Sequence, residues 1–199
     1  MYKSYISLEI RILLLTGVKT FCSCGPDVSC PVCREEPGSL PVLNPLAARK
    51  ACLLIRGLGG GVCREVPYER NLSAPVLPEI SAGKPVASLS RLSIKLGGGT
   101  MDIHFHRRKK RVHITEIRLE EDAGRLIHGP QGTYMDYSRA GMPSLRIRTA
   151  PDFEIAEEAE VFLSGLRRRI QYLGIIPAIP RENSLESLIR CNAYVALAP

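Results

Sequence analysis

The chain has 199 residues, of which 45% are hydrophobic and 24% are charged, and its formal net charge is +7. This length suffices for one ordinary domain with its own core. The apolar stretch near the N-terminus is interrupted by Glu9 and Arg11, and no segment approaches the roughly 20 apolar residues that a membrane-spanning helix needs. We therefore expect no signal peptide and no membrane anchor, and a soluble, cytoplasmic protein.

The first predicted element is a strand over residues 5–15. This segment is rich in Ile and Leu, and Glu9 and Arg11 lie two residues apart within it. Residues two apart point to the same face of a strand. We therefore expect both charged side chains on one face, which is a candidate polar site.

A cysteine-rich stretch, FCSCGPDVSCPVC, follows at residues 21–33. Its two cysteine pairs flank a Gly-Pro-Asp turn, and they are Cys22, Cys24, Cys30 and Cys33. Zinc binds four thiolates about 2.3 Å from the ion in a tetrahedron, and clustered cysteines in a reducing compartment bind metal more often than they form disulfides. The spacing favours a zinc clip, while reduced structural thiols and a redox pair stay open as alternatives. With four cysteine ligands, the zinc would be structural and not catalytic.

A helix is predicted to begin at Asn44-Pro45, because Asn is a favoured N-cap and Pro a favoured first helical residue. It runs to about Leu58 and ends at Gly59–Gly61. The run GLGGG superficially resembles a phosphate-binding loop, but it follows a helix instead of preceding one, and no GxxxxGK[ST] motif occurs. We interpret it as a helix stop.

Residues 66–100 contain four prolines and little periodicity, so they predict long loops with one strand near residues 89–96. The segments MDIHFH and VHITEIRL alternate with period two and predict two further strands. The basic run Arg107–Arg111 between them is most simply a hairpin turn, and a contact to nucleic-acid phosphates is the alternative that the net charge permits. The histidines are expected to be surface or structural groups: His104, His106, His113 and His128.

The clearest predicted helix runs from Asp152 to Leu173. Its apolar residues recur every three or four positions, acids crowd its first turns, arginines its last, and Gly174 ends it. We expect Phe162, Leu166 and Ile170 to pack on a sheet. With two strong helices in a strand-rich chain, the pattern predicts one α+β domain over residues 1–199 with a largely antiparallel sheet.

Several uncommon strings together resemble the B subunit of the tRNA-dependent amidotransferases, which convert glutamyl-tRNA or aspartyl-tRNA to the amide. ISLEIRILL is similar to that family's GLEVHVQL strand, and LEEDAG, LIH and DYxRAG follow in the family's order. FCSC, CPVC, PGSLPVLN, RRRIQYLG and SLIRCNAYV also agree, so that the resemblance covers nearly the whole chain.

The resemblance implies a glutamine-synthetase-like cradle that uses ATP and magnesium to phosphorylate the tRNA-borne carboxylate, after which ammonia from a separate amidase subunit displaces phosphate. It assigns a magnesium and phosphate site to Glu9, Glu120 and Glu121. It also strengthens zinc binding by Cys22, Cys24, Cys30 and Cys33, and implies tRNA as a partner. The family's helical and tail domains, which grip tRNA, would lie beyond the cradle-like domain represented here.

Three positions depart from the family pattern. Arg11 stands where the family has His, Arg146 where it has Glu, and Asn192 where it has the Asp of its RCD motif. Together these changes remove acids or add positive charge around one expected site. We therefore expect weakened or lost activity in a module that binds a partner, a nucleotide or tRNA. A subunit whose site another chain completes and a zinc-stabilised structural remnant are the alternatives.

Overall fold

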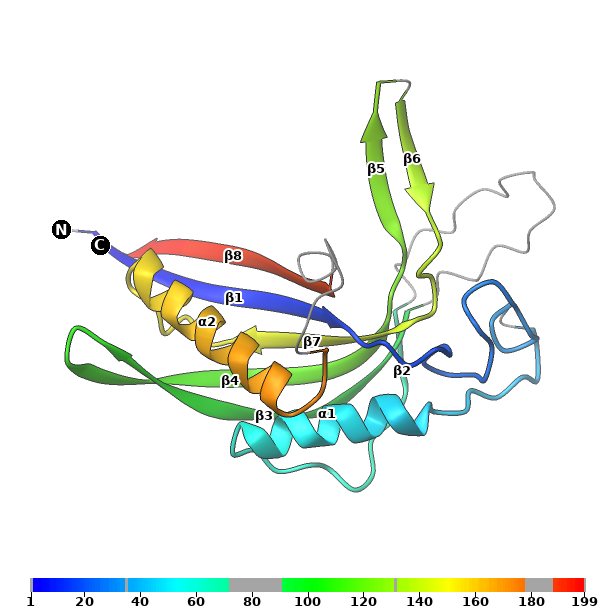
Figure 1. The fold of residues 1–199 in the computed structure, drawn as a ribbon, viewed down its shortest axis with the longest axis horizontal. Coiled ribbons are helices and arrows are strands. Elements are labelled where there is room, and N and C mark those ends of the chain that lie inside the picture. Colours follow the sequence, from blue (N-terminus) through cyan, green and yellow to red (C-terminus); the bar gives the residue numbers. More distant parts are fainter. Residues whose placement is uncertain (1, 35, 72–90, 131, 178–187, 199) are drawn as a thin grey trace.

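A six-stranded antiparallel sheet organises the protein, whose computed structural model describes residues 2–34, 36–71, 91–130, 132–177 and 188–198. The strand order is β2-β3-β4-β7-β1-β8. These strands are β1 (Lys3–Leu13), β2 (Glu69–Asn71), β3 (Arg91–Phe105), β4 (Arg108–Glu121), β7 (Pro143–Thr149) and β8 (Ile189–Ala198). A separate hairpin of β5 (Arg125–Gly129) and β6 (Gly132–Asp136) projects away from the sheet (Figure 1).

Both helices, α1 (Pro45–Gly57) and α2 (Ala156–Tyr172), lie on the same face of the sheet (Figure 1). The predicted α+β class with an antiparallel sheet and two helices is therefore confirmed. Within the described ranges, no helix is both long enough and apolar enough to cross a membrane.

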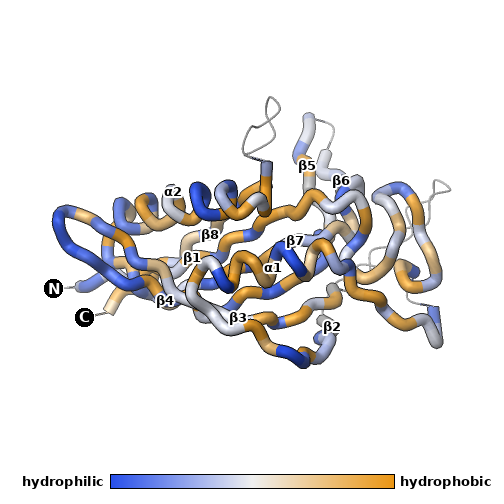
Figure 2. Tube along the Cα trace, turned by 60° about the horizontal axis from the view of Figure 1, so that its bottom comes forward, coloured by the Kyte–Doolittle hydropathy of each residue, from blue (hydrophilic) through white to orange (hydrophobic). Residues whose placement is uncertain are grey.

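The core fills the space between the sheet and the two helices. Alternate residues of β1 point into it, and Ile6, Leu8, Ile10 and Ile12 are each at most 8% exposed. From α2, the residues expected to pack on the sheet do so, with Phe162, Leu166 and Ile170 at most 1% exposed. The apolar stripes of the helices and the alternating strands are visible in Figure 2. The polar residues that alternate with these apolar ones along the strands point to the opposite face of the sheet.

Helix α1 begins and ends as its sequence predicts. The Asn44 side chain accepts hydrogen bonds from the N–H groups of Leu46 and Ala47, at 3.0 and 3.2 Å. After the helix, a Cβ on Gly60 would lie 2.0 Å from the carbonyl oxygen of Gly98 in β3. The glycine run therefore stops the helix and lets its end pack directly against the backbone of the sheet.

Strand β3 is longer than the sequence pattern predicts. It runs continuously through Gly97–Gly99, where its register with β4 shifts twice, so the predicted strand near residues 89–96 and the MDIHFH strand are one element. Residues 72–90, where we expect long loops, lie outside the described part of the chain.

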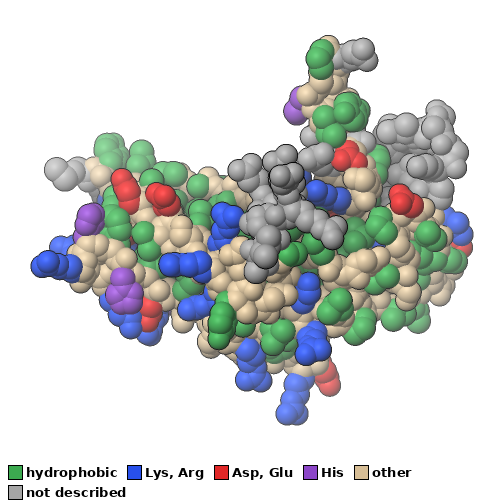
Figure 3. Space-filling view, viewed as in Figure 1, with side chains coloured by type: hydrophobic (Ala, Val, Ile, Leu, Met, Phe, Trp, Pro, Cys, Tyr) green, Lys and Arg blue, Asp and Glu red, His purple; other side chains and the backbone are tan. Residues whose placement is uncertain are grey.

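The sequence predicts the whole basic run Arg107–Arg111 as the turn between two strands, but only Arg107 lies in the β3–β4 turn. The turn itself is His106-Arg107, both with positive φ, and Arg108–Arg111 belong to β4. Lys109 and Arg111 pair with Asp102 of β3, while basic and histidine side chains gather at this end of the molecule (Figure 3).

Candidate functional site

The four clustered cysteines converge in the loop between β1 and α1. Their Sγ atoms all lie within 4.8 Å of one another, and each cysteine is half-buried. The Cys22 and Cys33 Sγ atoms are 3.2 Å apart, and those of Cys30 and Cys33 are 3.8 Å apart. Four sulfurs around a tetrahedral zinc ion lie roughly 3.8 Å from one another, given a Zn–S distance of about 2.3 Å. The donor set and its spacing therefore fit zinc.

The environments of the thiols differ across the cluster. Burial raises the pKa of Cys22 well above its ordinary value. Burial acts in the same direction on Cys30, but hydrogen bonds from backbone N–H groups and neighbouring thiols outweigh it and lower its pKa to about 7. A thiolate is the form that binds metal, so the lowered pKa of Cys30 favours its metal-binding form.

A second group of functional side chains occupies the sheet face opposite the helices, which we call the charged face. It is defined by Glu9, Arg11, Glu116, Arg118, Glu120, Arg146, Arg148, Arg190 and Asn192. Cross-strand register places them together, because Glu9 lies opposite both Arg148 and Asn192, and Arg11 opposite both Arg146 and Arg190. Directly opposed residues of antiparallel strands point to the same side. On this face the arginines outnumber the carboxylates.

Glu9 lies at the centre of this arrangement and is 5% exposed. Its Oε1 accepts hydrogen bonds from Nε and Nη2 of Arg11, at 3.2 and 3.0 Å. Its Oε2 lies 2.9 Å from both Nε and Nη2 of Arg148. Burial alone would raise the pKa of Glu9, but the two guanidinium groups outweigh it and lower that pKa. Both carboxylate oxygens are thus engaged by arginine.

Glu120 is paired in a similar way. Its side chain is 8% exposed, and its Oε1 lies 2.9 Å from Nη2 of Arg146. Burial lowers the pKa of the Arg146 guanidinium, and its Nε is buried without a hydrogen-bond partner among the described residues. Glu121 is the next residue of β4, so strand alternation directs it to the other face. The three positions that depart from the family pattern, Arg11, Arg146 and Asn192, all lie beside Glu9 or Glu120.

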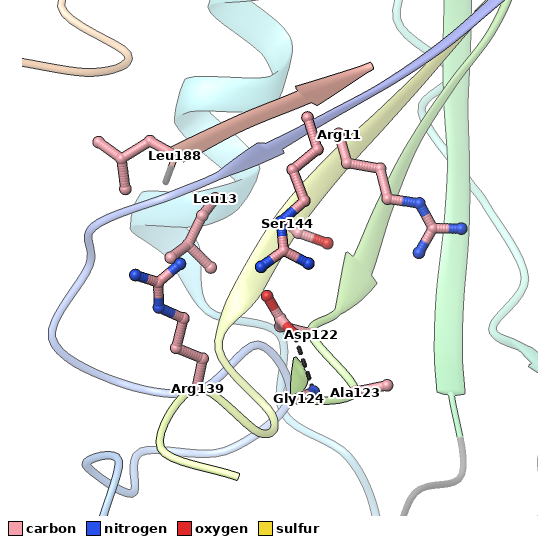
Figure 4. Close-up of a pocket in the computed structure, with 9 residues that line it drawn as sticks. Arg11, Leu13, Asp122, Ala123, Gly124, Arg139, Ser144 and Leu188 are labelled. Atoms are coloured by element: carbon pink, nitrogen blue, oxygen red, sulfur yellow. Dashed lines mark hydrogen bonds between the residues drawn. The ribbon is translucent and has the colours of Figure 1, made fainter. Parts of the chain in front are cut away.

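A small pocket opens at one end of the charged face, with a volume of about 80 Å³. Its polar lining consists of Asp122, Arg139, Ser144, Arg11 and Arg190. Figure 4 shows the first four grouped around the pocket. The Gly124 N–H donates to Oδ1 of Asp122 at 2.8 Å. Burial raises the pKa of Asp122, although Arg190, Arg139 and Arg11 act against the shift. Three guanidinium groups around one carboxylate give this pocket a positive balance.

These acids do not fit magnesium as they stand. Mg²⁺ binds carboxylate oxygens at about 2.0–2.1 Å and keeps several waters in an octahedron. Both oxygens of Glu9 and Oε1 of Glu120 instead accept from guanidinium groups. A divalent cation would have to displace Arg11 or Arg148 before it could reach Glu9, and at Glu120 it would meet the charge of the Arg146 guanidinium.

The sequence identified Glu9, Arg11, Glu120 and Arg146 as candidates, and the structure brings them together on one face. Two arginines that line the pocket, Arg139 and Arg190, and the Glu9 partner Arg148 were not singled out. The alternation of SLRIRT in β7 could have indicated Arg148, since it places two arginines on one strand face. Arg139 and Arg190 lie in segments whose pairing only the fold establishes.

Comparison with known proteins identifies relatives over almost the whole chain. Residues 4–199 match the family model described as the GatB/GatE catalytic domain. The B subunit of the aspartyl/glutamyl-tRNA(Asn/Gln) amidotransferase of Thermus thermophilus is 35% identical over 197 residues, covering 94% of this chain and 40% of the relative. The corresponding B subunits of Carboxydothermus hydrogenoformans and Chlorobium luteolum are 35% and 36% identical, covering 100% of this chain and 42% of each relative. The chain thus spans about two fifths of the length of these curated relatives.

Proposed function

Because this chain belongs to the GatB/GatE catalytic domain family, we propose that it is a divergent relative of the amidotransferase B subunit that binds phosphate without magnesium. In this proposal the charged face corresponds to the family's cradle, and the chain does not activate the carboxylate of glutamyl-tRNA or aspartyl-tRNA by itself. The chemical class of ligand is a terminal phosphate group, such as that of ATP.

The observation that carries this proposal is the pairing of Glu9 with Arg11 and of Glu120 with Arg146. The family resemblance assigns metal binding to both acids and places neither arginine in its pattern. A guanidinium held beside a carboxylate supplies the positive charge that a metal ion would otherwise supply. The acids are thereby neutralised without a metal, and the site loses its means of holding Mg²⁺.

Phosphate binding follows from the pocket at the end of the same face. Arginine presents a planar fork of donors that matches phosphate oxygens in pairs, and Arg11, Arg139 and Arg190 all line the pocket. A volume of about 80 Å³ suits one phosphate group and not a whole nucleotide. A terminal phosphate suits a small pocket better than a phosphodiester, because it has three free oxygens and only one attachment to accommodate.

The cysteine cluster adds a structural zinc ion to this proposal. Four cysteine ligands leave no open position on the metal, so the ion would stabilise the loop between β1 and α1 and take no part in phosphate binding. An amidase subunit of the amidotransferase and tRNA are the partners that the relatives' name suggests. We propose both for assemblies in which another chain completes the site.

The test is binding of ATP and of inorganic phosphate to the purified, zinc-loaded protein, measured by calorimetry with and without Mg²⁺. We expect binding that Mg²⁺ does not strengthen, and a loss of roughly tenfold or more in Arg139→Gln or Arg190→Gln, since each removes a charged donor. Arg34→Gln, which removes an exposed arginine paired with Glu36, is the matched control.

Two outcomes would contradict the proposal. No binding of either ligand would favour a zinc-stabilised structural remnant. Magnesium-dependent ATP binding, with amide formation on misacylated tRNA when an amidase subunit is added, would favour a working subunit that another chain completes.

A further inference from the structure

Lys19 is a buried lysine at the edge of the cysteine cluster. It is only 3% exposed. Its Nζ donates a hydrogen bond to the carbonyl oxygen of Val28 at 2.7 Å and a second one to Sγ of Cys33 at 3.6 Å. In the part of the chain that the structure describes, no carboxylate lies within ion-pair distance of this ammonium group. Its only prospective anionic partner there is a cysteine thiolate.

The surrounding backbone holds Lys19 in place. Its N–H donates to the carbonyl of Cys24 at 2.9 Å, and its own carbonyl accepts from Nδ2 of Asn44 at 3.2 Å. Its aliphatic stem passes Gly141, where an added Cβ would lie 2.9 Å from Cδ of the lysine. Gly141 has a φ of +79°, so a glycine both permits this turn and leaves room for the lysine stem. The ammonium group is thus directed at the cluster by contacts from three separate segments.

An ammonium group buried without an anion is costly, because the interior solvates charge poorly. Four thiolates around one Zn²⁺ carry a net charge of −2, which is costly to bury for the same reason. Each charge offsets the other only when the clip holds its metal. We infer that Lys19 is the charge partner of the metal-loaded clip and positions Cys33 through the contact between its Nζ and the cysteine Sγ; this inference rests on the proposed zinc site.

If Lys19 acts through its charge, Lys19→Met should have opposite effects on the metal-loaded and the metal-free protein, which a packing role does not predict. In the metal-loaded protein, Lys19→Met removes the favourable charge and weakens zinc binding. In the metal-free protein no zinc–thiolate cluster faces the ammonium group, so the same change removes a buried charge that the metal site does not compensate. It should therefore leave the unfolding temperature unchanged or raise it. A lysine that acted only by packing would lower the stability of both forms together.

The experiment measures zinc affinity by competition with a chromophoric chelator, and thermal unfolding with and without zinc. We expect affinity to fall by roughly 10- to 100-fold in Lys19→Met, the range typical of lost outer-shell contacts to metal ligands. Lys19→Gln keeps a donor for the Val28 carbonyl and should lose affinity similarly if charge is the cause. Lys50→Met is the control, since Lys50 is half-buried and its Nζ donates to the carbonyl of Ile175 at 2.9 Å, away from the clip.

Unchanged zinc affinity in both Lys19 variants would overturn the inference while leaving the zinc clip intact. An equal loss in Lys50→Met, or a lowered unfolding temperature of metal-free Lys19→Met, would also overturn it by assigning the effect to packing. If the unaltered protein did not bind zinc, the proposed zinc site would be wrong, and this inference would be wrong with it.

Discussion

Reverting the three divergent positions should restore a magnesium site on the charged face. The change is Arg11→His, Arg146→Glu and Asn192→Asp in one chain. It removes the Arg11 guanidinium from Glu9 and the Arg146 guanidinium from Glu120, and it adds two carboxylates next to these acids. Arg148 stays on Oε2 of Glu9. We expect the unaltered chain not to bind Mg²⁺ at millimolar concentration, and the reverted chain to bind it with a dissociation constant of about 1 mM.

The magnitude follows from the distance between Arg11 and Glu9. Nη2 of Arg11 lies 3.0 Å from Oε1 of Glu9, and Mg²⁺ would lie about 2 Å beyond that oxygen, so the two cations would be separated by about 5 Å. Their repulsion is then about 6 to 7 kcal/mol at an effective dielectric constant near 20, whereas a millimolar site is worth only about 4 kcal/mol. Even half of that repulsion would reduce the binding free energy of Mg²⁺ from about 4 to about 1 kcal/mol, which corresponds to a dissociation constant near 0.2 M.

Calorimetric titration with Mg²⁺ measures this directly, and circular dichroism checks that the reverted chain is folded. Glu9→Gln in the reverted background is the control and should abolish the binding. Millimolar binding by the unaltered chain that Glu9→Gln removes would refute the reasoning, since it would show that Arg11 yields to the ion. A folded reverted chain that gains no binding would refute it equally, because Arg148 would then suffice to block Glu9.

Three further predictions concern stability. Truncation of Leu166, which is 1% exposed, by Leu166→Ala should lower the free energy of unfolding in urea by about 2 to 5 kcal/mol, and a loss below about 0.5 kcal/mol would mean that this face of α2 is not core. Elemental analysis should find zinc in the unaltered protein and none in Cys30→Ser, and the variant should have a lower unfolding temperature, because metal binding in such a clip contributes folding free energy. Finding no metal in the unaltered protein would contradict this prediction. Burial would raise the pKa of Glu158, but hydrogen bonds from Lys110 and from backbone N–H groups lower it overall. The ionised Glu158 therefore contributes to folding stability above the ordinary pKa of Glu, and this contribution is lost as the pH falls through the pKa in the folded protein. Glu158→Gln should therefore reduce stability by about 1 kcal/mol or less at pH 7 and by less than that at about pH 3. An equal effect at both pH values would exclude the ion pair as its cause.

Helix α1 could be predicted almost completely, because its boundaries depend on local chemistry. Asn44 caps it and Leu58 follows it, as the sequence indicates. Helix α2 begins later than its periodic pattern suggests. The acids and the glycine that mark its ends are local signals, but Phe153 forms a bridge with Ile6 of β1, with the Ile6 N–H donating to the Phe153 carbonyl at 2.8 Å. That tertiary contact keeps the residues before Ala156 extended.

Strand β3 was harder to predict because its centre consists of three glycines, Gly97–Gly99. Glycine usually indicates a turn or a break in a strand. Here a Cβ on Gly98 would lie 2.4 Å from the carbonyl of Ile114 in β4, and one on Gly99 would lie 2.6 Å from the carbonyl of Leu58 after α1. The glycines are needed where the sheet meets the end of α1, and nothing in the local sequence reveals that meeting point.

The candidate site shows a similar division between local and long-range information. Period two in β1 predicts that Glu9 and Arg11 share a face, and their side chains do make contact. The pairing of Glu9 with Arg148, 139 residues further along the chain, depends on the order of β1 and β7 in the sheet. Sequence alternation can therefore assign a residue to a face, whereas only the register assigns its partner.

That register also explains how a face can lose its metal without losing its fold. Glu9 and Glu120 are both buried, and buried carboxylates require a compensating positive charge. The family resemblance implies a divalent cation in that role, which is present only when bound. Arg11 supplies the charge from the same strand as Glu9, and Arg146 supplies it from the strand next to that of Glu120. Neither can dissociate, so the acids stay compensated in every ligand state. The same two arginines that we propose to exclude Mg²⁺ therefore allow both acids to remain buried, and the proposed loss of metal-dependent chemistry need not destabilise the sheet.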